Sequence, residues 1–486
     1  MAAATAAVAA AVAAAGTAAT AEPDVVAPPV DPATPVDRCV EHRWWTPLRL
    51  LLITATLVCT LGLVTKAPCA VDDGARWFSD SGGAARLCAS DLPAEYATSG
   101  LAEGTSPWGT DGGRWPAVSV SGPVGALQVG TAAVTRVVFG VDEEQRAAGD
   151  ASRVEESPEV AREAVVYTGL VSVLLVVLLL LALGSLGRAA LTRARLQCWP
   201  PWVRPVEALM PIAAAPLLVV LVGVGWDLLG VAITAAALAA WTRGRAATAG
   251  ALLGLGTAAA GWPALVAVAL VAAALLRHGE AVGRLVGTAL AVVAAITLPA
   301  LVLTGGDAVI GPLRGWIYDD DPVGSVWALL AEVGVSADER VVASLVIGLA
   351  AFAVCATFAW TVRGAVVTST ARVAFVLLAV VLGVGASYEP GYALWLLVPA
   401  VLARPAWRDL LVWQAAEIFA VCATWWHVAG TNDATSDGPD AVLVVAIALR
   451  IVVTAWFAVR LFTADPPQLR SDPPALAGAR PRPAVH

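Results

Sequence analysis

The stretch "AVVYTGLVSVLLVVLLLLALGSLG", residues 164–187, decides the fold, because it runs for 24 residues without a charge. About 20 apolar residues are enough for a helix to cross the roughly 30 Å hydrocarbon core of a bilayer. The rest of the chain has the same character: 58% of its residues are hydrophobic, against about 45–50% in soluble proteins, and its mean hydropathy is +0.76. The composition predicts an all-α, polytopic transmembrane helix bundle.

Apolar runs of similar character recur along the chain and predict about twelve crossings, the shorter ones tilted or buried within the bundle. The predicted crossings lie near residues 48–65, 164–187, 206–222, 224–241, 246–261, 263–276, 283–303, 341–361, 371–388, 390–403, 409–428 and 441–462. They form one transmembrane domain, residues 44–463. The Ala- and Pro-rich residues 1–43 and the Pro-rich residues 464–486 are predicted to be disordered tails.

The arginines predict the orientation, because short loops rich in arginine stay on the cytoplasmic side. With twelve crossings they fall on one side, at positions 43, 49, 188, 193, 195, 204, 243, 245, 277, 284, 363, 372, 404, 408 and 460. This places both termini in the cytoplasm of a multi-pass cell-membrane protein. The long loop 66–163 is then external. Its apolar segment 117–140 is predicted to be re-entrant or interfacial, because a further crossing would place Arg188–Arg204 outside.

Acidic and aromatic residues gather at the predicted external ends of the helices. The first external loop contains "LCASDLPAEYATSGLAEGTSPW", residues 87–108, and three external turns follow at "GWD" (225–227), "GWP" (261–263) and "SYEPGY" (387–392). Short hydrophobic pairs interrupted by Gly or Pro are typical of sites built from broken helices. The candidate site residues are Asp91, Glu95, Asp227, Trp262, Tyr388, Glu389 and Tyr392. Alternatively, the loop carboxylates are only solvated, and Asp227 is only a helix cap.

Three other features are weaker. Cys69 and Cys88 share the external loop, where an oxidising exterior would permit a disulfide, and the sequence leaves that bridge open. Asp319 and Asp321 in "YDDD" have the spacing of a divalent-metal pair, but a charge run beside Pro322 is more typical of a solvated turn, so no metal or cofactor is predicted. The net charge of −8 comes largely from acidic loops and the tails and does not indicate nucleic-acid binding.

The order of these segments resembles a known family. One span, a long external loop with "CASDLPAEY" and "GTSPW", then "GWDLLGVA", "AGALLGLGTAAAGWP" and "SYEPGYALWLLVPAVLARPAWRDLLVWQAAEIF" are similar to actinobacterial membrane glycosyltransferases of the GT-C superfamily, in particular glycosyltransferase family 87. The resemblance covers roughly residues 44–463. It implies a mannosyltransferase-like enzyme that takes mannose or a similar sugar from a polyprenyl-phosphate donor in the outer leaflet and transfers it to a glycan or glycolipid acceptor of the cell envelope.

The resemblance also implies roles for residues. An acidic residue of the first external loop acts as the base in an inverting transfer, which needs no general acid because the lipid phosphate is already a good leaving group. Asp91 is the candidate and Glu95 the alternative. A donor phosphate also needs cations, for which the external arginines are candidates, with Arg114 favoured over Arg86, Arg76 and Arg314.

The chain departs from the family pattern at four positions. Gly225 stands where the family has Asn, Gly261 and Ala386 stand where it has Lys, and Gly391 stands where it has Gln. Two cations and two amides are therefore missing from the expected site. These losses keep two alternatives open: a noncatalytic relative that binds a lipid-linked sugar or scaffolds envelope assembly, and a transporter of lipid carriers.

Overall fold

The structure is a computed structural model that describes residues 45–70, 82–105, 120–139, 158–196, 206–275, 279–304, 324–335, 338–363, 369–430 and 440–463, with isolated residues between 309 and 317. Within these ranges the regular secondary structure is entirely helical. The chain divides into two units, residues 1–46 and 47–486, and all that follows concerns the second. Both predicted tails lie outside the described residues.

Five described helices are long and apolar enough to cross a membrane. They are α2 (Pro47–Ala70), α7 (Pro158–Leu196), α13 (Gly279–Thr304), α16 (Glu339–Arg363) and α20 (Ala441–Thr463). The shorter apolar helices are α10 (Asp227–Thr242), α11 (Ala246–Ala260), α12 (Pro263–Ala274), α17 (Thr370–Gly383) and α18 (Tyr392–Leu402). The helix α19 (Trp407–Val428) is as long as a crossing but carries Arg408, Asp409 and Glu417.

Each predicted apolar segment coincides with helical structure, but the segment 206–222 is not one helix. It is divided into η3 (Glu207–Leu209), α8 (Met210–Ala213) and α9 (Pro216–Leu221). Pro211 and Pro216 lie at the starts of α8 and α9. A proline lacks the N–H that would continue the preceding turn and favours the first turn of a new helix. The crossing predicted near 206–222 therefore corresponds to three short helical pieces, and both prolines are visible in the sequence.

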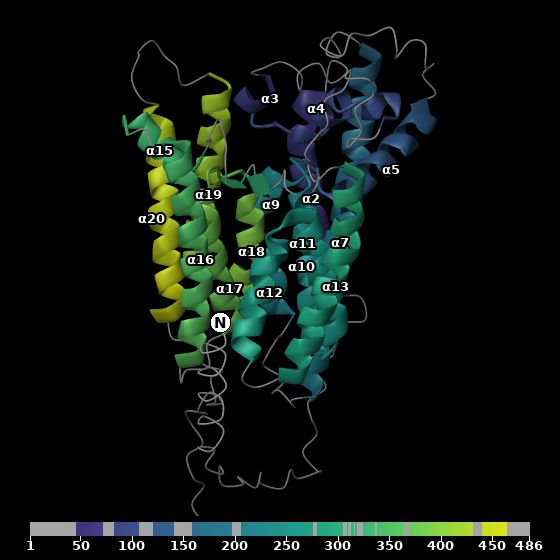
Figure 1. The fold of residues 1–486 in the computed structure, drawn as a ribbon. Helices are drawn as coiled ribbons and strands as arrows, with labels where there is room; N and C mark the ends of the chain where they lie inside the picture. Colours follow the sequence, from purple (N-terminus) through teal and green to yellow (C-terminus); the bar gives the residue numbers. More distant parts are fainter. Residues whose placement is uncertain are drawn as a thin grey trace, which may run out of the picture. The chain divides into compact units, whose positions relative to one another are not determined.

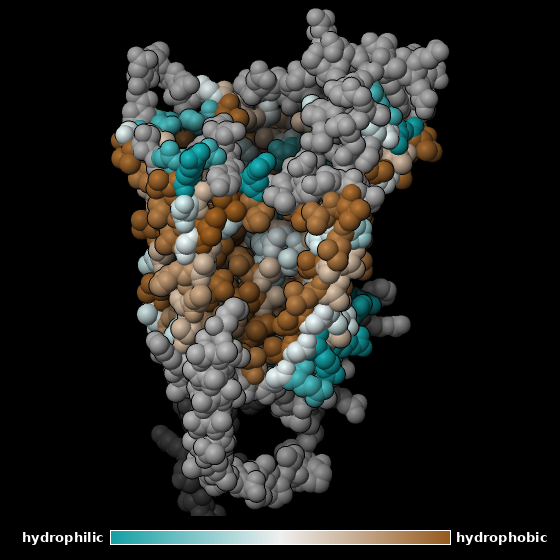
Figure 2. All heavy atoms as spheres, in the orientation of Figure 1, coloured by the Kyte–Doolittle hydropathy of each residue, from teal (hydrophilic) through white to brown (hydrophobic). Residues whose placement is uncertain are grey.

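The side surface of the helices is apolar. Exposed side chains include Leu57 on α2, Val302 on α13 and Phe352 on α16, which are 65%, 82% and 70% exposed. Figure 2 shows hydrophobic residues around the middle of the visible face, with hydrophilic residues toward its ends. A water-soluble fold would not leave this much apolar surface uncovered. The protein therefore has the character of a helical membrane protein.

Four short elements lie at one end of these helices. They are α3 (Gly82–Ala85), α4 (Asp91–Thr98), η1 (Leu101–Glu103) and α5 (Gly122–Phe139), and Figure 1 places α3, α4 and α5 at the upper end. Of the segment predicted to be re-entrant or interfacial, 117–140, the residues Gly122–Phe139 form α5. Its inward face buries Gln128 and Thr135, and its outward face exposes Val134 and Val137. Such a two-faced helix suits the surface of a membrane.

Small residues allow the closest helix contacts. The α11 helix packs mainly against α13 and α10, and α10 packs against α7. A side-chain carbon at Gly250 of α11 would lie 2.1 Å from the carbonyl oxygen of Leu285 on α13, and one at Gly254 would lie 2.5 Å from that of Ala289. These two glycines form a G-x-x-x-G pair, which lets helix backbones approach in membranes.

We expect Gly250→Val to separate α11 from α13 and to destabilise the protein by about 3 kcal/mol, because the added carbon meets backbone that cannot move aside. Thermal unfolding of the detergent-solubilised protein measures this. The matched control is Gly287→Val on α13, where an added carbon meets nothing within 4 Å. Equal losses of stability in the two variants would contradict the close contact.

Candidate functional site

The N-terminus of α4 is fixed to the turn that precedes α10, although 133 positions separate Ser90 from Gly223. The Ser90 hydroxyl donates a hydrogen bond to the carbonyl oxygen of Gly223 at 2.7 Å. The N–H of Asp91 donates to the carbonyl oxygen of Val224 at 2.8 Å. Gly223 has φ +72°, a conformation that favours glycine. This pairing of backbones brings the first residue of α4 beside the first residue of α10.

A second anchor joins the same region to α2. Cys69, near the end of α2, forms a disulfide with Cys88, three residues before Asp91. The bridge that the sequence left open is therefore present. The Lys66 ammonium on α2 also donates a hydrogen bond to the carbonyl oxygen of Ala89 at 3.2 Å. The start of α4 is thus held by both α2 and the turn before α10.

The carboxylates of Asp91 and Asp227 lie on either side of Gly225. A side-chain carbon at Gly225 would be 3.7 Å from Oδ2 of Asp91 and 3.5 Å from Oδ2 of Asp227. The Asp227 carboxylate also rests directly on Gly391, where an added carbon would lie 2.0 Å from its Oδ2. Glycine at 391 therefore leaves the space that Asp227 occupies. Asp91 is exposed and Asp227 is partly buried, so Asp91 is the more accessible of the two.

The positive charge of Lys66 acts on the Asp91 carboxylate. Lys66 is buried, 5% exposed, and its ammonium lies 4.7 Å from the ring centroid of Trp425. Desolvation by the surrounding protein raises the pKa of the Asp91 carboxyl above its usual range, and the charge of Lys66 opposes that rise. Lys66 therefore favours the ionised form of Asp91.

Glu95 lies one helical turn after Asp91 but is held differently. Its carboxylate accepts hydrogen bonds from the indole N–H of Trp226, at 2.8 Å, and from the side-chain amide of Gln128. Burial raises the pKa of Glu95 to about 7, the hydrogen bond from Trp226 opposes the rise, and the charge of Asp91 adds to it. Both oxygens of Glu95 thus already have donors, whereas Asp91 is an exposed residue.

A row of aromatic rings continues from Asp227. Trp262 stacks on Trp395 with centroids 5.3 Å apart, Trp395 stacks on Tyr392 at 4.3 Å, and Tyr392 meets Tyr388 edge-on at 5.4 Å. The indole N–H groups of Trp262 and Trp395 are buried. Neither of them donates a hydrogen bond to another described residue. Trp395 nevertheless lies close enough to Asp227 to stabilise its charge. We name Trp262, Trp395, Tyr392 and Tyr388 the aromatic row.

A buried polar cluster supports the far end of the aromatic row. The Arg450 guanidinium of α20 lies over the Tyr388 ring, 3.6 Å from its centroid. The Tyr388 hydroxyl donates to the Glu417 carboxylate of α19 at 3.2 Å. Trp413 and Thr454 also donate to Glu417, each at 3.1 Å. Glu417 and Arg450 are 1% and 4% exposed and interact through their charges.

Comparisons with known proteins make no assignment. No family model matches this chain, and neither does any curated protein. The geometry of the carboxylates, Lys66 and the aromatic row therefore carries the functional argument.

The structure brings together most of the predicted site residues. Asp91 faces Asp227, Asp227 lies against Gly391 beside Tyr392, and the aromatic row links Tyr392 to Trp262 and Tyr388. Glu95 joins them through Trp226.

The remaining predicted residues are Glu389, Arg86, Arg114, Asp319 and Asp321. Glu389 is exposed beside the buried Tyr388, and Arg86 is exposed in the turn that follows α3. The residues Arg114, Asp319 and Asp321 lie outside the described part of the chain. No group of three potential metal ligands occurs among the described residues.

Sequence reasoning missed three residues that support the site: Lys66, Glu417 and Arg450. Lys66 is the only lysine of the chain and lies near the end of the first long helix, α2. Glu417 and Arg450 each lie inside an apolar helix. A charge at membrane depth costs a few kcal/mol and is functional by default. That rule singles out Asp227 and applies equally to these residues.

We expect Glu95→Gln to stabilise the protein more at pH 8 than at pH 5. The pKa of Glu95 is about 7 in the folded protein, above its ordinary value of 4.5, so ionisation removes stability as the pH rises from about 4.5 to 7. The amide avoids this cost, on the order of 1–3 kcal/mol. A flip of Gln128, whose side-chain oxygen makes no hydrogen bond in the described structure, restores the second hydrogen bond.

The measurement is the Tm of both proteins in detergent at the two pH values, with a relative gain of about 2–4 °C expected at pH 8. The exposed Glu280 supplies the control Glu280→Gln, which should change the Tm equally at both values. A gain for Glu95→Gln that is independent of pH would contradict the buried position of this carboxylate.

Proposed function

We propose that the chain is a membrane glycosyltransferase of the GT-C type. In this proposal about twelve crossings surround a site that opens on the external face. The enzyme transfers mannose or a similar sugar, with inversion, from a polyprenyl-phosphate donor to a cell-envelope glycan or glycolipid. The observation that carries the proposal is the convergence of Asp91 from the first external loop with Asp227, Lys66 and the aromatic row.

Asp91 acts as the base in this proposal. The residue is exposed, and Lys66 favours its ionised form, so its carboxylate can accept the proton of an acceptor hydroxyl as that oxygen attacks the sugar. The C–O bond to the lipid phosphate breaks, and the phosphate departs with the electron pair. Glu95, held by Trp226 and Gln128, positions α4 rather than taking the proton.

Lys66 supplies positive charge near the leaving phosphate. The resemblance implied lysines at positions that carry Gly261 and Ala386, and a phosphate without cations would lose charge-assisted hydrogen bonds of about 1.5–3 kcal/mol each. Lys66 comes from a different helix but reaches the same group of residues. The rings of the aromatic row offer apolar faces of the kind that pack against a sugar or a prenyl chain.

The test uses membranes that contain the chain, incubated with polyprenyl-phosphate mannose or arabinose and a cell-wall acceptor. The expected result is a glycosylated acceptor that forms only when the chain and the lipid-linked donor are both present. Equal product from membranes without the chain would contradict the proposal.

A noncatalytic binder of lipid-linked sugars is the second candidate, favoured by the small residues Gly261 and Ala386 at positions of expected lysines. It predicts donor binding without transfer. A photoreactive polyprenyl-phosphate sugar that labels the chain, with no acceptor product in the same membranes, would favour this candidate over the enzyme.

A further inference from the structure

A pocket lies at the far ends of α10 and α18, the two helices that begin at the site residues Asp227 and Tyr392. It has a volume of about 350 Å³ and lies between the ends of α7, α10 and α18 and the η3 segment. The α10 helix runs from Asp227 at the carboxylate site to Thr242 at this pocket, and α18 runs from Tyr392 to Leu402. Sixteen helical residues of α10 span about 24 Å. The pocket is therefore separate from the site around Asp91 and Asp227.

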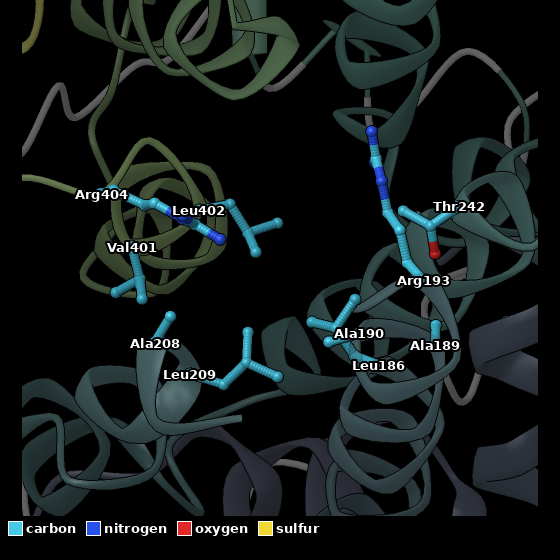
Figure 3. Close-up of a pocket in the computed structure, with 10 residues that line it drawn as sticks. All are labelled: Leu186, Ala189, Ala190, Arg193, Ala208, Leu209, Thr242, Val401, Leu402 and Arg404. Atoms are coloured by element: carbon cyan, nitrogen blue, oxygen red, sulfur yellow. The ribbon is translucent and has the colours of Figure 1, made fainter. Parts of the chain in front are cut away.

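The pocket combines apolar walls with two arginines. Its lining residues are Leu186, Ala189, Ala190, Arg193, Ala208, Leu209, Thr242, Val401, Leu402 and Arg404. Figure 3 shows Arg404 extending from α18 toward the open space, with Arg193 on α7 across from it. Forked guanidinium groups are suited to phosphate oxygens, while the surrounding aliphatic side chains cannot bind an anion. Phosphate carried on an apolar molecule matches both properties.

The backbone of Arg404 adopts an unusual conformation. Arg404 follows the C-cap of α18 and has φ +56°, in the left-handed region. Glycine is the usual residue at this position after a helix, because a side chain is strained there. Glycine should therefore fit the backbone at position 404 with less strain.

The location identifies the class of ligand. The apolar part of α7 ends near Gly187, and the pocket lies at this end of the helix, with Arg193 and Arg404 in its lining and Arg188 and Arg243 next to lining residues in the sequence. The concentration of arginine predicts the cytoplasmic side, whose lipid leaflet carries anionic headgroups. Basic pockets between membrane helices on that side bind such headgroups. We propose that this pocket binds the headgroup phosphate of an anionic phospholipid through Arg404 and Arg193, with the acyl chains against the apolar helices.

Native mass spectrometry of the full-length protein, exchanged into detergent with phosphatidylglycerol or phosphatidylcholine, tests the proposal. Wild type should retain phosphatidylglycerol about tenfold more than phosphatidylcholine, and Arg193→Gln and Arg404→Gly should each lower that retention by about tenfold. Because glycine suits the backbone at 404, Arg404→Gly should keep or raise the Tm, which separates loss of lipid from loss of fold.

Arg408→Gln is the matched control, since Arg408 is exposed nearby on α19, beside Trp407, and does not line the pocket. It should retain lipid as wild type does. Retention by Arg404→Gly equal to that of wild type, or an equal loss in Arg408→Gln, would overturn the proposal. Displacement of the lipid by millimolar inorganic phosphate would also overturn it, because the pocket would then bind a soluble anion.

Discussion

Replacement of Asp91 by asparagine is expected to lower the rate of sugar transfer by about 100- to 10,000-fold, the contribution of a positioned general base. Asparagine preserves the shape of the side chain, and the backbone bond from residue 91 to Val224 does not depend on the carboxylate. The variant should therefore fold and bind the donor but fail to take the acceptor proton. Initial rates of acceptor glycosylation, at protein levels matched by quantitative blotting, measure the effect.

The control for this experiment is Asp409→Asn. Asp409 forms an ion pair with Arg460 and lies at the start of α19, in the part of the chain predicted to be cytoplasmic. Its replacement removes the same chemical group without touching Asp91 or Asp227 and should leave the rate within about twofold of wild type. Full activity of Asp91→Asn would remove Asp91 from the mechanism.

Replacement of Arg450 by methionine is expected to cost about 3 kcal/mol of stability, because it leaves the buried Glu417 without its positive neighbour. The three hydrogen bonds that Glu417 accepts remain and keep the loss at the lower end of the range for a broken buried pair. The Tm in detergent should fall by about 5–10 °C. Because Arg450 also lies over Tyr388, the aromatic row should loosen and the rate of transfer should fall too.

Arg460→Met on the same helix is the matched control. Arg460 is 44% exposed and pairs with Asp409 at the surface, where an ion pair contributes about 0–1 kcal/mol. The double variant Glu417→Gln with Arg450→Met should recover most of the lost stability, since no unpaired charge is left. Equal effects of Arg450→Met and Arg460→Met would show that the buried pair has no special role.

Much of the fold follows from local properties of the sequence. Hydropathy alone located the helices, because an uninterrupted apolar run has no other stable form in lipid. The break in the helix at 206–222 follows from Pro211 and Pro216, which lie at the starts of α8 and α9. The number of crossings is harder to derive from the sequence: five helices are long enough by themselves, whereas helices as short as α18 or α12 depend on their neighbours for a place in the membrane.

The site was predictable in part. Asp91 and Asp227 could be grouped because both follow breaks at the same predicted face, and the structure places them on either side of Gly225. The different behaviour of Glu95 could not be predicted, since Gln128 lies on α5 and Trp226 precedes α10, and no local pattern connects them to α4. The role of Lys66 depends in the same way on tertiary contacts with Ala89 and Asp91.

The proposed mechanism is tested most directly by the position of a lipid phosphate in a structure of the full-length chain bound to polyprenyl-phosphate mannose. It predicts phosphate oxygens within about 4 Å of the Lys66 ammonium, the distance of an ion pair. It also predicts that the sugar faces the carboxylate of Asp91, with Asp227 and the aromatic row around it. A donor whose phosphate lies away from Lys66 and whose sugar does not reach Asp91 would contradict it.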